Sequence, residues 1–259
     1  MARLLLAALL VVSAPSALAQ SVPVRYAEGS VHGFLVVRTL EGKVLADGDL
    51  IQTSTAARVT TKLVFRFSDG SFQEQTTVFS QGKRFRLISD RLVQKGPSFP
   101  QPLTMTVDGG SGEVTVKYSD DNGKAKVDTD RITVPPDLAN GLLLTMLKNV
   151  GSGPPPKTVS MVVATPKPRL VKLEISPATV ESFSTNGMPR KAAHYVIKIN
   201  LGGISGVVAP LVGKQPPDSH VWMLQGEVPV FVKAEQPFYA GGPIWRIELT
   251  SPTWSHDES

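Results

Sequence analysis

The stretch ARVTTKLVFRFSDGSFQEQTTVFS, residues 57–80, decides the fold class. In its first half Leu63, Phe65 and Phe67 lie on one face, with the polar Lys62, Arg66 and Ser68 on the other. This period of two predicts a strand with one buried face and one face in water. Asp69-Gly70 predicts a tight turn with positive φ, after which the chain returns as a second strand. The stretch is therefore expected to form an antiparallel hairpin.

The same rhythm continues along the chain, where 21 Pro and 22 Gly separate β-branched and aromatic runs. Turn residues about every eight to twelve positions are typical of many short antiparallel strands, and Asn122-Gly123 is the strongest hairpin signal. We expect a mainly β fold, a large curved antiparallel sheet or open barrel with one amphipathic helix. Its expected strands are Val31–Thr39, Ala57–Ser68, Phe72–Ser80, a run through Phe85 and Leu87, Leu103–Val107, Glu113–Tyr118, Ala125–Val127, Thr158–Ala164, Leu170–Ile175, Thr179–Phe183, Ala192–Asn200, Ser205–Leu211, Val221–Leu224, Val228–Val232 and Ile244–Leu249.

One segment departs from this rhythm and predicts a helix from Pro136 to Val150. Leu138, Leu142 and Met146 recur at helical spacing, and proline followed by aspartate is typical of a first turn. An interior Gly141 lowers helix propensity by about 1 kcal/mol relative to Ala. We therefore expect the helix to depend on packing against the sheet.

The N-terminus has the three parts of a secretory signal, predicted to cover residues 1–19. A positive Arg3 precedes the apolar run Leu4–Val12, and Ala17-Leu18-Ala19 is a small-residue cleavage site. The apolar run is too short to span a bilayer. Cleavage after Ala19 leaves 259 − 19 = 240 residues and lowers the net charge from +5 to +4.

The remaining composition predicts a soluble exported protein of the bacterial periplasm or extracellular space. There is no Cys and no Asn-x-Ser/Thr site, and no later apolar run is long enough for a transmembrane segment. A chain of this length can bury a core without disulfides. We expect one β domain over 20–252, or two halves, 20–150 and 157–252, joined by the Gly/Pro stretch 151–156, followed by a polar tail, 253–259.

No catalytic, metal-binding or cofactor motif is found. His32, His194, His220 and His256 have no metal-ligand spacing, and Gly203-Ile204-Ser205-Gly206 misses the nucleophile elbow of hydrolases by one position. Carboxylates that could pair as in a glycosidase are assigned mostly to turns. They are Asp47, Asp49, Asp69, Glu74, Asp90, Asp128 and Asp130. The sequence shows no other enzyme-like feature, so we expect a non-enzymatic role.

A loose group of positive charges comprises Lys83, Arg84, Arg86, Arg91 and Lys95, interrupted by Asp90. Such an array can meet phosphate or anionic lipid headgroups. A solvated strand face is the competing interpretation. Nucleic acid is not expected as a partner, because no dense basic stripe with interleaved aromatics is present.

The C-terminal region combines glycines with aromatics. Small residues allow a ligand or another backbone to approach closely, so Trp222, Phe238, Tyr239 and Trp245 are the candidate ligand-binding residues. They would line a concave apolar surface. The alternative is that they pack as core at tight bends of the sheet.

The chain resembles uncharacterised bacterial exported proteins in the broad style of envelope lipoprotein carriers. The resemblance rests on the predicted signal, the meander around Phe65–Ser71, the predicted helix and the glycine-rich strand ending at Pro217. That resemblance implies a concave apolar face that holds acyl chains, and no catalytic residue. The leading hypothesis is a non-enzymatic envelope protein that binds a lipid, another amphipathic ligand or a protein partner on a curved sheet. The alternatives are a hydrolase of envelope or extracellular polymers, using paired carboxylates, and a structural or assembly component.

Overall fold

The computed structural model describes residues 21–55, 57–120, 122–150, 157–185, 187–200 and 216–250. The predicted signal, the Gly/Pro stretch 151–156, the predicted strand at 205–211 and the polar tail lie outside the described residues. Among the described residues, no helix is both long and apolar enough to cross a bilayer.

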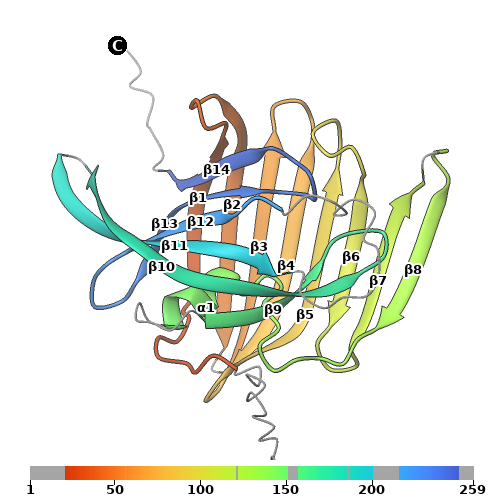
Figure 1. Ribbon diagram of the computed structural model, residues 1–259, viewed down its shortest axis with the longest axis horizontal. Helices are drawn as coiled ribbons and strands as arrows, with labels where there is room; N and C mark the ends of the chain where they lie inside the picture. The colour runs from red at the N-terminus through yellow and green to blue at the C-terminus, as the bar shows by residue number, and fades with distance from the viewer. Residues whose placement is uncertain are drawn as a thin grey trace, which may run out of the picture.

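The described residues form one antiparallel sheet of 14 strands, which confirms the predicted fold class (Figure 1). The order across the sheet is β8-β7-β6-β5-β4-β3-β2-β1-β14-β13-β12-β11-β10-β9. Strands on both sides of residues 151–156 therefore belong to the same sheet. Their bounds are Val31–Arg38 (β1), Val44–Thr55 (β2), Arg58–Phe67 (β3), Phe72–Gln81 (β4), Phe85–Lys95 (β5), Leu103–Asp108 (β6), Glu113–Ser119 (β7), Ala125–Arg131 (β8), Lys157–Val163 (β9), Arg169–Thr185 (β10), Met188–Asn200 (β11), Ser219–Leu224 (β12), Val230–Pro237 (β13) and Ile244–Leu249 (β14).

The hairpin predicted from residues 57–80 is formed by β3 and β4, with a longer turn than expected. Phe67 N donates to Ser71 O at 2.9 Å, and Gly70 N donates to Phe67 O at 3.1 Å. The connection therefore spans three residues, with Gly70 at φ 83° in the left-handed position. A glycine suits that position because it has no Cβ to clash.

The sheet is strongly curved, so that its two halves face each other. Figure 1 shows β9, β10 and β11 crossing in front of the strands β3–β6, with helix α1 (Leu143–Val150) beside the crossing. A core of buried side chains, here called the helix core, joins the two halves. Its members include Phe79, Phe85, Met105, Leu142, Met146, Leu173 and Ile197.

A second, smaller core lies where β1, β2 and β3 meet β14, and is here called the aromatic core. Its buried members are Leu35, Val37, Ala46, Phe65, Phe67, Phe99, Trp245 and Ile247. Buried polar side chains also occur on β4 and β5, namely Gln73, Thr77, Asp90 and Gln94. The interior of the curved sheet is therefore not uniformly apolar.

The helix prediction is wrong at its N-terminal end, since α1 begins at Leu143 and not at Pro136. The residues before it bind the outer edge of β9 instead. Ala139 N donates to Ser160 O at 2.7 Å, and the Asn140 amide exchanges two 2.8 Å bonds with the backbone of Val162. These contacts satisfy an edge strand that would otherwise present unpaired backbone groups.

Two strand predictions also differ from the structure. Leu170–Ile175 and Thr179–Phe183 belong to one 17-residue strand, β10, which crosses Pro177 through a register shift between Pro177 and Val180. A bulge of this kind tolerates proline inside a sheet. β2 was not predicted, because its Asp and Gly residues are untypical of strands.

Candidate functional site

Three of the four predicted ligand-binding aromatics gather in the aromatic core. The Trp245 ring lies 5.0 Å from Phe238 and 6.5 Å from Tyr239, between ring centroids. Trp245 is buried, while Phe238 and Tyr239 are half-buried. Phe238 and Trp245 also pack against Phe67, whereas Tyr239 packs against Phe99. Their role in binding a ligand stays a prediction.

Trp222 lies elsewhere, on β12, and is not part of that cluster. Its ring stacks on His194 at 4.3 Å with an interplanar angle of 5°, and Lys233 Nζ lies 3.9 Å from its ring centre. The four aromatics therefore do not form one surface. The indole nitrogen of Trp222 is buried without a hydrogen-bond partner.

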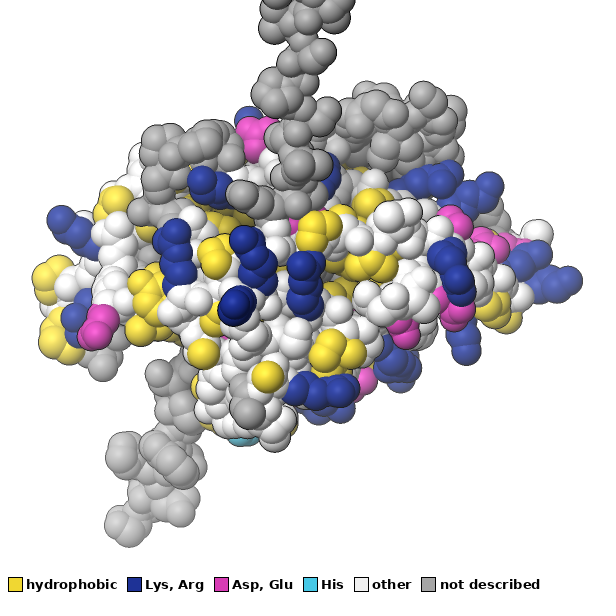
Figure 2. Space-filling model, turned by 90° about the horizontal axis from the view of Figure 1, so that it is seen from below, with side chains coloured by type: hydrophobic (Ala, Val, Ile, Leu, Met, Phe, Trp, Pro, Cys, Tyr) yellow, Lys and Arg dark blue, Asp and Glu magenta, His cyan; other side chains and the backbone are white. Residues whose placement is uncertain are grey.

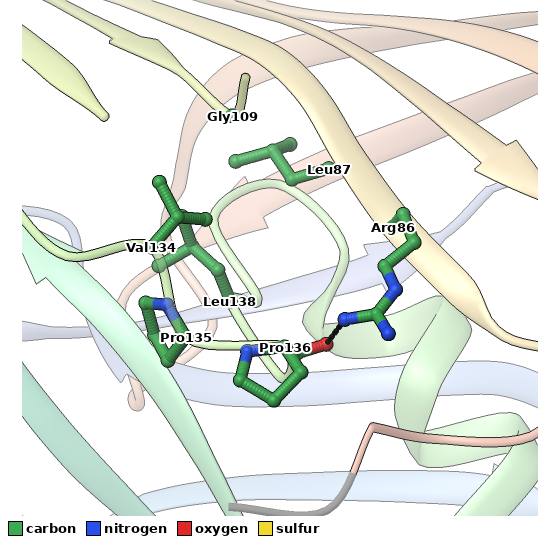
Figure 3. Close-up of a pocket in the computed structure, with 7 residues that line it drawn as sticks. All are labelled: Arg86, Leu87, Gly109, Val134, Pro135, Pro136 and Leu138. Carbon is green, nitrogen blue, oxygen red and sulfur yellow. Dashed lines mark hydrogen bonds between the residues drawn. The ribbon is translucent and has the colours of Figure 1, made fainter. Parts of the chain in front are cut away.

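A pocket of about 290 Å³ lies at one end of the sheet, between the start of β5 and the segment before α1 (Figure 3). It is lined by Arg86, Leu87, Gly109, Val134, Pro135, Pro136 and Leu138. Figure 3 shows Arg86 and Leu87 extending from β5 toward the loop of Val134–Leu138. Sequence reasoning missed this pocket, because its walls come from three distant parts of the chain.

The pocket combines apolar side chains with polar backbone groups and one cation. Leu87 and Leu138 are buried members of the helix core, and Val134 packs against that core. The Arg86 guanidinium donates to Pro136 O at 3.1 Å, which holds its charge at the pocket rim. A pocket that joins apolar side chains and polar backbone groups to a single fixed charge can orient an amphipathic anion.

Gly109 closes the wall of this pocket. A Cβ at this position would lie 2.2 Å from Leu87 O, and Gly109 N donates to Ile88 O at 2.9 Å. Only a residue without a side chain allows the turn after β6 to approach β5 so closely.

Ser160 and Lys172 form a cluster that resembles a serine–lysine catalytic pair, but its geometry is structural. Lys172 Nζ lies 2.6 Å from Ser160 Oγ, whose hydroxyl donates to Asp137 Oδ1 at 2.7 Å. Asp137 and Ser160 are fully buried. A nucleophile must be accessible to substrate, and a lysine that donates to the hydroxyl is not acting as its base. The cluster fixes the segment before α1 onto β9 and β10.

Asp90, on β5, is buried, with 1 % exposure. Burial raises the pKa of Asp90 to about 6 from its ordinary 3.8, and hydrogen bonds from Thr77 and Gln75 oppose this rise. Thr77 Oγ1 donates to Asp90 Oδ1 at 2.7 Å. Gly141 lies directly over this pair, since a Cβ there would be 1.8 Å from Thr77 Oγ1.

A carboxylate–histidine–histidine chain lies beside Trp222. Glu181 Oε1 is 3.1 Å from His194 Nδ1, and His194 Nε2 is 2.9 Å from His220 Nδ1. Burial lowers the pKa of His194, as do His220 and Lys233, whereas Glu181 and Glu235 oppose the shift. Both ring nitrogens of His194 are engaged, so neither is available to a metal ion. No group of three His, Cys, Asp or Glu side chains within the described ranges is arranged to hold one.

The carboxylates considered for a hydrolase lie mostly within strands, so their assignment to turns was wrong except for Asp69. Asp49 pairs with Arg66 at 2.9 Å, and Glu74 pairs with Lys62 at 2.9 Å. Such pairing compensates the charge of each carboxylate in the sheet. These contacts do not favour a catalytic pair.

Comparison with protein-family models and with curated proteins gives no match. Among solved structures, the chain is similar to a beta-barrel-like protein of a domain of unknown function, DUF1849, from Brucella abortus. The TM-score is 0.44 at 12 % sequence identity, and the match covers 86 % of this chain and 94 % of that chain.

Proposed function

We propose that this chain is a non-enzymatic exported envelope protein that binds an amphipathic anion in the pocket beside Arg86. The observation that carries the proposal is the combination of apolar side chains, polar backbone groups and one rim cation in a pocket of about 290 Å³. The apolar part of the ligand would lie against Leu87, Val134 and Leu138. Its anionic head would pair with the guanidinium.

The size of the pocket limits the ligand. Sites for drug-sized molecules occupy about 300–1,000 Å³, so this pocket is at the small end of that range. It suits one short or partly inserted acyl chain. Met146 of helix α1 and Leu142 just before it pack into the helix core on the concave side of the sheet. This leaves less room there than the resemblance to lipoprotein carriers implies.

A structural or assembly role is the second candidate, and one observation favours it. A component of this kind would have a flat, well-filled sheet with no cavity, so the pocket beside Arg86 counts against it. The sheet is curved, but the helix core fills the space between its two halves. Absence of ligand binding in the experiment below would leave this role as the better proposal.

Dodecanoate is a suitable probe, because it joins a carboxylate to an acyl chain. We expect it to raise the Tm of the protein, whereas dodecyltrimethylammonium, with the same chain and the opposite charge, does not. Native mass spectrometry of protein purified from its host should also reveal a bound lipid or fatty acid. No Tm change with dodecanoate and no bound lipid would contradict the proposal.

Two variants test the pocket itself. Arg86→Gln should weaken dodecanoate binding about tenfold or more, because a hydrogen bond to a charged group contributes about 1.5–3 kcal/mol. Val134→Phe should block the cavity. Arg91→Gln is the matched control, since Arg91 is also on β5 but pairs with Glu74. Equal weakening in the control would show that the pocket is not the binding site.

A further inference from the structure

An array of positive charge lies at one end of the sheet and shares Arg86 with the rim of the pocket. Arg25, Arg58, Lys83, Arg84 and Arg86, here called the basic end, are all exposed. The sequence suggested a different group, which included Arg91 and Lys95. The structure places Arg91 against Glu74 and Lys95 over the ring of Phe72.

Backbone contacts bring the basic end together from three parts of the chain. Ser80 of β4 pairs with Arg58 of β3 on one side and with Arg86 of β5 on the other. Neighbouring strands are about 4.8 Å apart, so the two arginine backbones lie about 10 Å apart.

The N-terminal segment supplies the remaining contacts. Val24 N donates to Lys83 O at 3.1 Å, and Pro23 bridges to Arg84. Arg25 N donates to Asn149 Oδ1 at 2.8 Å, beside the end of α1. Arg25 is thereby held next to the β4–β5 turn.

The charges of the basic end are not compensated by carboxylates. In the parts of the chain that the structure describes, none of the five forms a salt bridge, while Arg38, Lys62, Arg66, Arg91 and Arg246 on the strands all do. Arg84 and Arg86 donate to the backbone oxygens of Ser21 and Pro136, which orient them without neutralising them. The nearby Glu28 is paired with Lys148 at 3.2 Å and is largely buried.

Figure 2 shows this end of the molecule from below. Lys and Arg side chains form a row across its middle, with hydrophobic side chains between them, and acidic side chains gather mainly toward the sides. A broad exposed field of one sign suits a charged surface better than a single small ion.

We infer that the basic end docks the protein onto an anionic lipid bilayer. Each Lys or Arg close to such a surface contributes about 1 kcal/mol of attraction, which is about a fivefold gain in affinity. The hydrophobic side chains between the cations favour the headgroup region over a purely aqueous polyanion. The inference goes beyond the pocket and does not require that the pocket bind a ligand.

Vesicle co-sedimentation of the protein purified after export tests this inference. The protein should bind vesicles of phosphatidylglycerol and phosphatidylcholine, but not vesicles of phosphatidylcholine alone. Binding should weaken as salt is raised, since exposed charges are screened. Equal binding to both kinds of vesicle, or binding to neither, would overturn the inference.

Variants locate the binding surface. The double variant Arg25→Gln with Lys83→Gln should lower vesicle affinity about 25-fold, from the fivefold loss expected per charge. Neither residue lines the pocket or forms a salt bridge in the described residues, so the Tm without any ligand should stay close to that of the wild type and report intact folding. Lys117→Gln with Lys124→Gln is the matched control, because both lysines are exposed and form no salt bridge in the described residues. A similar loss in the control would refute a localised surface.

Two further outcomes separate bilayer binding from binding of a single phosphate group, and the basic end from the pocket. Competition by free glycerophosphate at concentrations similar to the lipid phosphate would indicate a site for one phosphate group and overturn the bilayer inference. Vesicle binding without any dodecanoate effect would support the basic end and contradict the pocket. The two proposals can thus fail independently.

Discussion

Replacing Asp90 by Asn is expected to stabilise the protein at neutral and alkaline pH. The carboxyl group is buried beneath Gly141, and an ionised carboxylate there lacks a cationic partner among its hydrogen bonds, which come from Thr77 and Gln75. An amide has the same shape without the charge. Its oxygen can accept the bond from Thr77, so the substitution removes the cost of burying charge while keeping the contact.

The sign and size of the effect follow from the pKa of Asp90, about 6 in the folded protein against an ordinary 3.8. Between these values the folded state binds more protons than the unfolded chain, so the free energy of unfolding falls as pH rises through this window. One pKa unit corresponds to about 1.4 kcal/mol, which gives a full cost of about 3 kcal/mol above pH 6. At about pH 4.5 the cost is only about 1 kcal/mol.

Urea unfolding followed by tryptophan fluorescence at about pH 4.5 and about pH 8 measures this difference. The advantage of Asp90→Asn over the wild type should be about 2 kcal/mol larger at the higher pH. Asp47→Asn is the control, because it removes a charge from an exposed position on β2. Its stability relative to the wild type should not increase between the two pH values. Parallel pH profiles for Asp90→Asn and the wild type would refute the reasoning.

Three further substitutions test the packing. Gly141→Ala should lower the free energy of unfolding by about 2–4 kcal/mol, because φ is +64° and the new methyl would overlap Thr77. Adding Thr77→Ala to this variant should restore part of the lost stability. An equal loss in the single and the double variant would exclude the overlap as the cause. Trp245→Ala should cost about 3–5 kcal/mol in urea unfolding, as expected for a buried aromatic, and a cost below 1 kcal/mol would contradict its core role. Because the pKa of His194 is lowered, the unfolded chain binds more protons at mildly acidic pH, so stability should fall as pH drops below about 6.5. His194→Gln should reduce the decrease in Tm at acidic pH when Tm is measured over a pH series. An unchanged slope of Tm against pH would show that His194, which contacts His220, does not cause the decrease.

Local patterns were sufficient for the β class and for many hairpins. The alternation around Phe65 predicts which face is buried, because successive side chains of a strand point to opposite faces. Asp69-Gly70 and Asn122-Gly123 lie in turns for local reasons, since each glycine adopts positive φ. Signals of this kind involve residues close in sequence, so they do not depend on the rest of the fold.

Tertiary contacts decided the remaining features. The helix lacks about the first two turns of its predicted length, residues 136–142, because Asp137–Asn140 pair with β9. Residues of β9 lie more than twenty positions later, so no helical periodicity records this pairing. Trp222 separated from Trp245 because β12 and β14 are not neighbours in the sheet order. The pocket at Arg86 and the basic end both arise where distant segments meet.

The sequence by itself thus determined the mainly antiparallel β architecture and predicted the export signal, because alternation and turn chemistry are local. The order of the strands, the start of α1, the burial of Asp90 and the grouping of Arg25 with Arg58 and Arg86 were decided only by the tertiary structure. These features depend on register and close approach between segments far apart in the chain, and such contacts leave no periodic signal in the sequence.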